Sequence, residues 1–310
     1  MRATLFVLIA SLAALAACTP SKPKNYDTPE AAVQALIDAA NSKGDGALLK
    51  VFGKSAKPLF NSGDEVADQN GREEFLAAYK AANSLDKSVE NSVTLEVGEG
   101  RWPFPIPLVM QDGKWHFDTE AGAEEIINRR VGENELDTIQ SCLAFADAQR
   151  EYYMRNPEND AFLHYADRLI STEGKKDGLY WPVADGEEQS PVGEGLARAR
   201  AEGYLKEGTA KGIPFHGYIY RLLTKQGPNA PGGAYEYLVD GKLLGGFAAV
   251  AFPAEYGNSG VMTFMVNHDG VVYSKDLGAD TAKLALAMEA FDPGPDWKRE
   301  AADGPTAAAN

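Results

Sequence analysis

The chain has 310 residues, with 30 lysines and arginines against 45 aspartates and glutamates, which gives a formal net charge of −15. A surface of this charge repels nucleic acid and anionic lipid, and no long basic run offsets it, so we expect no nucleic-acid partner. The length is enough for two ordinary domains.

The first seventeen residues have the pattern of an export signal. Arg2 precedes an apolar run, Leu5 to Leu15, which is too short to span a membrane. The stretch that follows, Leu15 to Cys18 with the sequence LAAC, resembles the bacterial lipobox, in which the cysteine is acylated and becomes the new N-terminus. The alternative is an ordinary secretory signal that happens to contain a cysteine.

The lipobox resemblance implies an exported lipoprotein that faces the periplasm, with a signal peptide at 1–17 and a lipidated tether at 18–27. The membrane is then a partner through the acyl chains on Cys18. Thr19 follows the cysteine, and this favours the outer membrane over the inner one. Cys142 is the second cysteine. It lies on the apolar face of a predicted helix, so we expect a buried, inert thiol and no intramolecular disulfide.

Residues 28–118 are predicted to form helices followed by a curved sheet. A helix begins at Thr28, with Pro29 at its first position. Asp112 and Gly113 predict a hairpin turn. The other expected elements are helices at 47–52 and 72–82 and strands at 92–97, 105–110 and 114–118. The order of elements and the ending DGKWHFD (112–118) resemble the cystatin-like α+β cone, a shape that fixes no function.

The second half is predicted to pack helices on an antiparallel sheet. A linking helix is expected at 119–134, followed by a long helix from Glu135 to about Arg155 with Asn134 as its cap. Further helices are expected at 161–170, 196–204 and 281–291, strands at 217–224, 235–239, 243–252, 261–267 and 271–275, and a disordered tail at 299–310. The fold class is therefore α+β.

Two stretches of residues 135–298 resemble the globular part of type IV pilins and pseudopilins. They are AFADAQREYY (144–153) on the long helix and GGFAAVAFPAEYGNSGVMTFMVNHDGVVY (245–273) in the sheet. The chain departs from pilins because its helix lacks the apolar N-terminal half and follows a whole domain. Pilus polymerisation is therefore not implied.

Six further stretches identify the whole chain as a member of domain-of-unknown-function family 2950. They are WPFPIPLV (102–109), DGLYWP (177–182), FHGYIYRLL (215–223), GGFAAVAFPAEYG (245–257), SGVMTF (259–264) and KDLG (275–278). This resemblance implies a compartment and a fold, and it implies no reaction.

No catalytic or metal motif is present. The sequence lacks G-x-S-x-G, H-E-x-x-H, P-loop and Rossmann patterns, and its four histidines have no zinc spacing. We therefore expect no catalytic residues, no metal and no cofactor. Two alternatives remain open: the loop Asn156 to Asp160 contains oxygen ligands of the kind calcium uses, and His216 begins a strand among aromatic residues, where it is either structural or functional.

The candidate binding residues are Asp177, Tyr180, Trp181 and His216. The two aromatic residues lie in a loop, where they either stack on a sugar or peptide or anchor the loop to the protein. The preferred hypothesis is a non-catalytic envelope module that binds or assembles with an envelope protein or a glycan. The alternative is a periplasmic enzyme of the hydrolase type with a site around His216, which requires catalytic groups to meet in one cleft.

Overall fold

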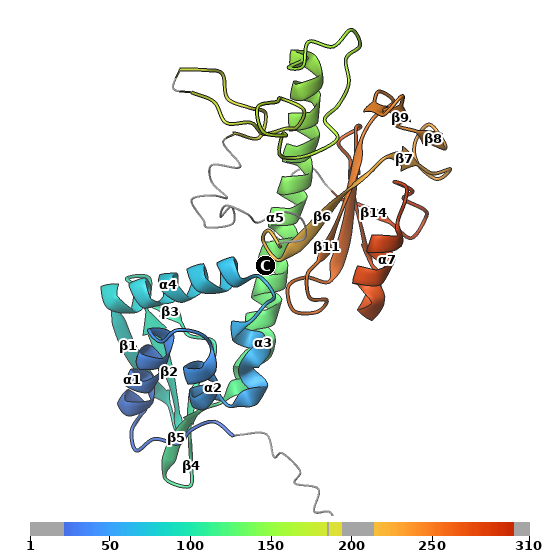
Figure 1. The fold of residues 1–310 in the computed structure, drawn as a ribbon. Coiled ribbons are helices and arrows are strands. Elements are labelled where there is room, and N and C mark those ends of the chain that lie inside the picture. Colours follow the sequence, from blue (N-terminus) through green and yellow to red (C-terminus); the bar gives the residue numbers. More distant parts are fainter. Residues whose placement is uncertain (1–21, 185, 194–213, 301–310) are drawn as a thin grey trace, which may run out of the picture.

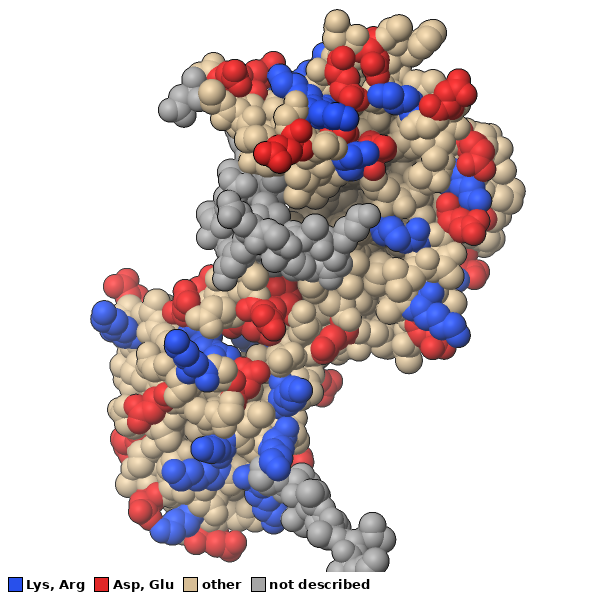
Figure 2. Space-filling model, viewed as in Figure 1, with Lys and Arg blue, Asp and Glu red and all other residues tan. Residues whose placement is uncertain are grey.

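Two lobes joined by one long helix make up the part of the chain that the computed structural model describes, residues 22–184, 186–193 and 214–300. The N-terminal lobe comprises residues 22–118, the C-terminal lobe comprises the described residues of 156–300, and helix α5 (Thr119–Arg155) runs through both (Figure 1). The same two lobes are seen in the space-filling view of Figure 2. Helices and antiparallel sheets together confirm the α+β class.

The N-terminal lobe packs short helices on a curved sheet. Its helices are α1 (Pro29–Ala40), α2 (Gly46–Phe52), the 3-10 turn η1 (Lys54–Ala56), α3 (Lys57–Phe60) and α4 (Glu65–Ala81). Its sheet has the order β1-β2-β4-β5, with β3 paired to β2, and contains β1 (Asn83–Val89), β2 (Ser92–Val97), β3 (Trp102–Pro103), β4 (Leu108–Gln111) and β5 (Lys114–Phe117).

Local capping sets where these helices begin. The side chain of Thr28 accepts a hydrogen bond from Ala31 N, and Pro29 occupies the first helical position, as the sequence predicts. Helix α4 begins seven residues before the predicted Arg72, because the Asp64 carboxylate accepts hydrogen bonds from Val66 N and Ala67 N. Strand β1 was not expected, since as an edge strand it is almost entirely exposed and has no apolar alternation.

The tether is shorter than predicted. Tyr26 is only 8% exposed and belongs to the N-terminal core, and its backbone forms a bridge with Trp115. Lys24 N also donates to Val51 O. The boundary at residue 27 is therefore wrong, because the chain is already packed on the lobe from Lys24 onward.

Helix α5 is continuous, whereas the sequence predicts a linking helix at 119–134 and a separate helix from 135. Asn134 does not cap a helix; its side chain donates to Ser259 O at 2.8 Å. Two faces of α5 pack against different cores. Ala123, Ile126 and Ile127 contact the N-terminal core. Ile139, Cys142 and Ala146 belong to the C-terminal core. The apolar residues of the two segments lie on different faces of α5, so the sequence pattern resembles that of two separate helices.

The C-terminal lobe contains a sheet of order β14-β13-β12-β11-β6. Its strands are β6 (Tyr218–Leu223), β11 (Ala248–Pro253), β12 (Met262–Asn267), β13 (Val272–Asp276) and β14 (Lys298–Arg299). Smaller pairs form from β7 (Lys225–Gln226) with β8 (Tyr235–Glu236) and from β9 (Leu238–Val239) with β10 (Lys242–Leu243), and η2 (Gly278–Asp280) leads into α7 (Thr281–Ala287). All six residues of β11 are buried, so the core lies around this strand.

Two expectations for this lobe are wrong, and two others concern residues outside the described ones. Residues 161–170 form a loop, because their backbone groups pair with other segments, as when Tyr165 N donates to Leu243 O. Lys298 and Arg299 pair with β13, so the predicted tail does not begin at 299. The predicted helix at 196–204 and the rest of the tail, 301–310, lie outside the described residues.

The two lobes have separate cores and separate sheets within the described residues. Polar contacts connect them. The Arg130 guanidinium donates to Pro58 O and to the Asn258 side chain, and Gly217 N donates to the Asp64 carboxylate. The lobes are therefore held in register by hydrogen bonds at their junction as well as by α5.

Within the part of the chain that the structure describes, no helix is both long and apolar enough to cross a membrane.

Candidate functional site

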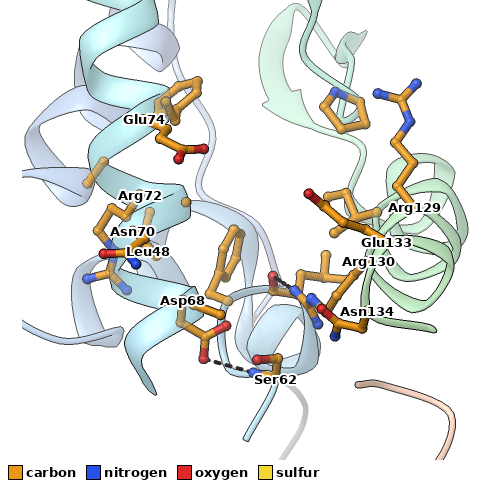
Figure 3. A pocket seen from close by; sticks show the side chains of 18 of the residues that line it. Leu48, Ser62, Asp68, Asn70, Arg72, Glu74, Arg129, Arg130, Glu133 and Asn134 are labelled. Atoms are coloured by element: carbon orange, nitrogen blue, oxygen red, sulfur yellow. Dashed lines mark hydrogen bonds between the residues drawn. The ribbon is translucent and has the colours of Figure 1, made fainter. Parts of the chain in front are cut away.

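A cavity of about 650 Å³ lies at the junction of the two lobes (Figure 3). Its walls come from α4 on one side and from the middle of α5 on the other, and His216 of the C-terminal lobe completes it. The volume is in the range of small-molecule binding sites. The cavity is therefore the first candidate for a functional site.

The floor of the cavity is apolar. It is lined by Phe60, Phe75, Phe104, Leu36, Leu48, Leu59 and Ile126. The rings of Phe75 and Phe104 have their centroids 5.4 Å apart, and Phe104 in turn lies 6.2 Å from Phe52 in the core. Because these rings pack on one another, the floor is a firm aromatic surface that can bury the apolar part of a ligand.

The arginines of the cavity already have partners. Arg72 pairs with Asp45 at 2.7 Å, and Arg129 pairs with Glu125 at 2.6 Å. Arg130 donates to the carbonyl oxygens of Pro58 and Leu59. Neither Asp45 nor Glu125 lines the cavity. The charges of Arg72 and Arg129 are therefore balanced by carboxylates outside the cavity, and Arg130 donates to neutral carbonyl groups.

Carboxylates dominate the remaining charge of the rim. Glu74 on α4 and Glu133 on α5 lie on opposite sides of the cavity (Figure 3). Within the described residues, neither is in an ion pair or side-chain hydrogen bond. Asp68 is half-buried and accepts a hydrogen bond from Ser62 N at 2.9 Å. Burial raises the pKa of Asp68, although the bond from Ser62 and the nearby Arg130 lower it in part. The electrostatic environment therefore favours a cation.

His216 lies at the edge of this cavity, at a φ of 49°, and its Nδ1 is 3.5 Å from the Asp137 Oδ2. Its ring also contacts Phe215 edge-on. The sequence predicts His216 as a candidate, whereas Asp137 was missed because it lies some 80 positions away on α5. Only the fold brings the two residues together.

The other predicted binding residues do not line the cavity. The Asp177 carboxylate accepts hydrogen bonds from Thr172 N at 2.7 Å and from Thr172 Oγ1 at 2.8 Å, and these bonds lower its pKa against the opposing effect of burial. Tyr180 pairs with residues 169–171 through its backbone. Trp181 is 6% exposed and packs on α5 beside Tyr152. In this structure these residues hold the loop on the helix.

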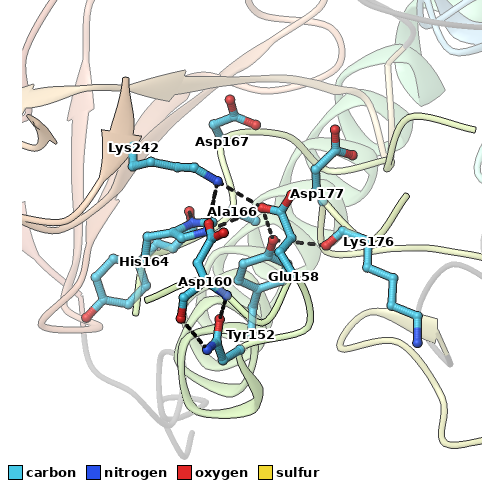
Figure 4. A network of polar contacts seen from close by, with 12 residues as sticks. Tyr152, Glu158, Asp160, His164, Ala166, Asp167, Lys176, Asp177 and Lys242 are labelled. Carbon is cyan, nitrogen blue, oxygen red and sulfur yellow. Dashed lines mark hydrogen bonds and ion pairs between the residues drawn. The ribbon is translucent and has the colours of Figure 1, made fainter. Parts of the chain in front are cut away.

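A compact polar network lies at the C-terminal end of α5 (Figure 4). Its members are Glu158, Asp160, His164 and Lys242. The Lys242 ammonium lies 3.1 Å from Glu158 Oε2, 2.8 Å from Asp160 Oδ2 and 3.1 Å from His164 Nε2. The ligand atoms of Glu158, Asp160 and His164 all lie within 4.8 Å of one another. These three residues could hold a metal ion.

The sequence predicts Asn156 to Asp160 as a possible calcium loop. It gives no reason to connect His164 or Lys242 with that loop. Asn156 ends α5 in the left-handed conformation and exchanges two hydrogen bonds with Asp160. The Asp160 to His164 spacing of four residues is the one local signal, and it is weak because no helix carries it. Cys18, the predicted lipid attachment site, lies outside the described residues.

Comparison with known proteins identifies the family of the chain. The family model described as "Protein of unknown function (DUF2950)" matches residues 23–300. No curated protein and no solved structure shows significant similarity to the chain. The cystatin-like and pilin-like resemblances of the two halves therefore stay predictions.

Proposed function

From the premise that the chain belongs to this family of proteins of unknown function, we propose that it is a lipid-anchored protein of the cell envelope. In this proposal it acts by binding, without catalysis, and its ligand has an apolar body and a cationic head. The junction cavity, with its phenylalanine floor and carboxylate rim, is the observation that carries the proposal.

The anchor rests on the N-terminal sequence. Arg2, the apolar run to Leu15 and the small residues before Cys18 together support cleavage and acylation at Cys18. Thr19 supports the outer membrane. A net charge of −15 gives no attraction to anionic lipid, so acyl chains are needed to keep the protein at a membrane. Cys18→Ser should release a soluble or unprocessed form in membrane fractionation; unchanged processing and anchoring would contradict the lipid anchor.

The binding chemistry follows from the division of the cavity into floor and rim. An apolar body is stabilised by burial against the phenylalanines. A cationic head is attracted by Glu74 and Glu133, while the neighbouring arginines are already engaged. Basic, apolar segments of envelope proteins have both properties. A neutral glycan has no cationic head and offers only the small apolar faces of its rings, so the proposal favours a protein partner.

The test compares two probes that differ in the charge of the head. Decyltrimethylammonium and decanoate carry similar apolar chains, and both are used below the concentration at which they form micelles. We expect one decyltrimethylammonium to bind per chain in calorimetry, and decanoate to bind more weakly. Glu133→Gln should reduce the preference for the cation. Stronger binding of decanoate would contradict the assigned chemistry.

Two glycines provide a matched pair of variants. A side chain at Gly71 would enter the cavity from α4 and meets no atom within 4 Å at its Cβ position; a side chain at Gly132 on α5 is equally unhindered but lies outside the cavity. Gly71→Leu should weaken decyltrimethylammonium binding by at least about tenfold, or ~1.4 kcal/mol. Gly132→Leu should leave it unchanged. Equal affinities of both variants and the wild type would place the ligand elsewhere.

A hydrolase-type enzyme is the second candidate, and one observation favours it. His216 Nδ1 and Asp137 Oδ2 face each other in the cavity wall, 3.5 Å apart, which is longer than the hydrogen bond of a general base to its orienting carboxylate but in the range of sites that tighten when substrate binds. A screen of esters, peptides and peptidoglycan fragments should show no turnover. Turnover that disappears in a folded His216→Ala variant would refute the binding module in favour of the enzyme.

A further inference from the structure

The network at the end of α5 is separate from the junction cavity, since none of its residues lines the cavity. We propose that Glu158, Asp160 and His164 form a binding site for a first-row divalent cation of the zinc class, which takes the place of the Lys242 ammonium between them. The inference does not depend on the proposed ligand of the cavity.

The ring of His164 is held in one orientation. Its side chain is 6% exposed, and its Nδ1 lies 3.0 Å from the carbonyl oxygen of Tyr165. A carbonyl oxygen can only accept a hydrogen bond, so Nδ1 carries the proton and the lone pair of a neutral ring is on Nε2. Metal-binding histidines are typically held in this way, with the second nitrogen bonded to a carbonyl or carboxylate.

The Nε2 atom of His164 faces two carboxylates. It lies 2.9 Å from Asp160 Oδ2 and 3.3 Å from Glu158 Oε2, both of which are acceptors when ionised. In the other neutral tautomer the unfavourable contact of two acceptors would move to Nδ1 and Tyr165 O. An acceptor Nε2 can lie this close to two carboxylates only with positive charge between them, and in this structure the Lys242 ammonium supplies it, 3.1 Å from Nε2.

The carboxylates of the network carry more charge than Lys242 neutralises. Glu158 and Asp160 contribute two negative charges, and Lys242 contributes one positive charge. Glu158 also accepts a hydrogen bond from the Tyr152 hydroxyl at 3.3 Å. A divalent cation at the centre would neutralise the two ligand carboxylates, and the flexible Lys242 side chain, 43% exposed, could turn to solvent.

The ligand set selects the type of metal. One imidazole nitrogen with two carboxylate oxygens is typical of zinc and its first-row neighbours. Calcium takes six to eight oxygen ligands, and the buried imidazole supplies none. The calcium interpretation of residues 156–160 is therefore replaced by one in which His164 is the decisive ligand.

The experiment measures binding of Zn²⁺ alone to the full chain after treatment with a chelator, by calorimetry and by the shift in melting temperature. We expect one Zn²⁺ per chain. His164→Ala, Glu158→Gln and Asp160→Asn should each weaken binding by at least about tenfold, because each removes one ligand. Lys242→Met should strengthen it, since the competing ammonium is gone. Ca²⁺ should neither bind at the same site nor displace Zn²⁺.

Two controls keep the outcome clear. Asp167→Asn removes a carboxylate of the same region that is paired with Arg168 and is not among the three ligands, so it should bind Zn²⁺ as the wild type does. Melting curves without metal identify any variant that fails to fold. Zn²⁺ binding that survives His164→Ala, or that occurs only in Lys242→Met and not in the wild type, would overturn the proposal, because Lys242 would then be the resident cation.

Discussion

Cys142 is 2% exposed, and burial raises the pKa of its thiol to about 12. The thiolate is the reactive species, so almost none of it is present at ordinary pH. In the Cys18→Ser chain, where Cys142 is the only thiol, iodoacetamide at pH 8 should leave the folded protein unmodified and should add one equivalent after denaturation. Mass spectrometry distinguishes the two; rapid modification of the folded chain would show that the site opens to solvent.

Asp68 provides a pH-dependent test of the cavity wall. Because its pKa is raised in the folded state, chiefly by burial, the folded chain retains this proton to a higher pH than the unfolded chain does. As pH rises from the ordinary Asp value through the raised one, Asp68 therefore lowers the free energy of unfolding.

Asp68→Asn should remove this decrease, so the stability of the wild type relative to the variant should fall across that pH window. Urea unfolding at a series of pH values measures the difference, with Glu74→Gln on the same helix as the control. Parallel curves for the wild type and Asp68→Asn would contradict the assigned environment.

At the scale of single elements, α5 offers a comparison of two of its glycines. A Cβ at Gly122 would lie 2.6 Å from Pro105 O and 2.7 Å from Ile106 Cγ1, whereas a Cβ at Gly132 would meet nothing within 4 Å. Gly122→Ala should therefore destabilise the protein by about 1–3 kcal/mol through overpacking. Gly132→Ala should stabilise it by up to about 1 kcal/mol, because alanine is the better helix former. Thermal unfolding of both variants checks the opposite signs.

Elements with strong local signals could be predicted from the sequence. Strand β2 has the predicted bounds, and its alternation of buried and partly exposed residues is regular. Helix α1 begins at its predicted cap, Thr28. The exposed edge strand β1 and the loop at 161–170 could not be predicted, because partners distant in the sequence decide them. The continuity of α5 was missed for a related reason: its two halves bury different faces in different cores.

The candidate site was less predictable than the fold. His216 could be singled out by residue type and aromatic neighbours, but the cavity beside it is formed by α4 and α5, whose approach no local pattern reveals. The same holds for His164, since Lys242 comes to it from β10, 78 positions later. A motif with characteristic spacing can be recognised from the sequence, whereas the cavity has none and the polar network has only the weak spacing of Asp160 and His164.

At the scale of the whole molecule, the relative position of the two lobes sets one side of the cavity, because His216 of the C-terminal lobe lines it beside residues of the N-terminal lobe and α5. Arg130 is central to this, because its guanidinium joins Pro58 O and Leu59 O of the N-terminal lobe to the Asn258 side chain of the C-terminal lobe. Asn258 in turn donates to Asn61 O at 3.0 Å. The polar groups of the junction therefore satisfy one another, and loss of one leaves others unpaired.

Arg130→Lys tests this coupling. A lysine carries the same charge but lacks the planar fork that reaches several acceptors at once. We expect a loss of about 1–3 kcal/mol from unpaired carbonyl groups, weaker binding in the cavity and a broader distance distribution in small-angle scattering. Arg129→Lys is the matched control, since the neighbouring Arg129 is exposed and pairs only with Glu125 within the described residues. If the two variants behave alike in stability and scattering, the lobes are held by α5 and apolar contacts, and Arg130 does not couple them.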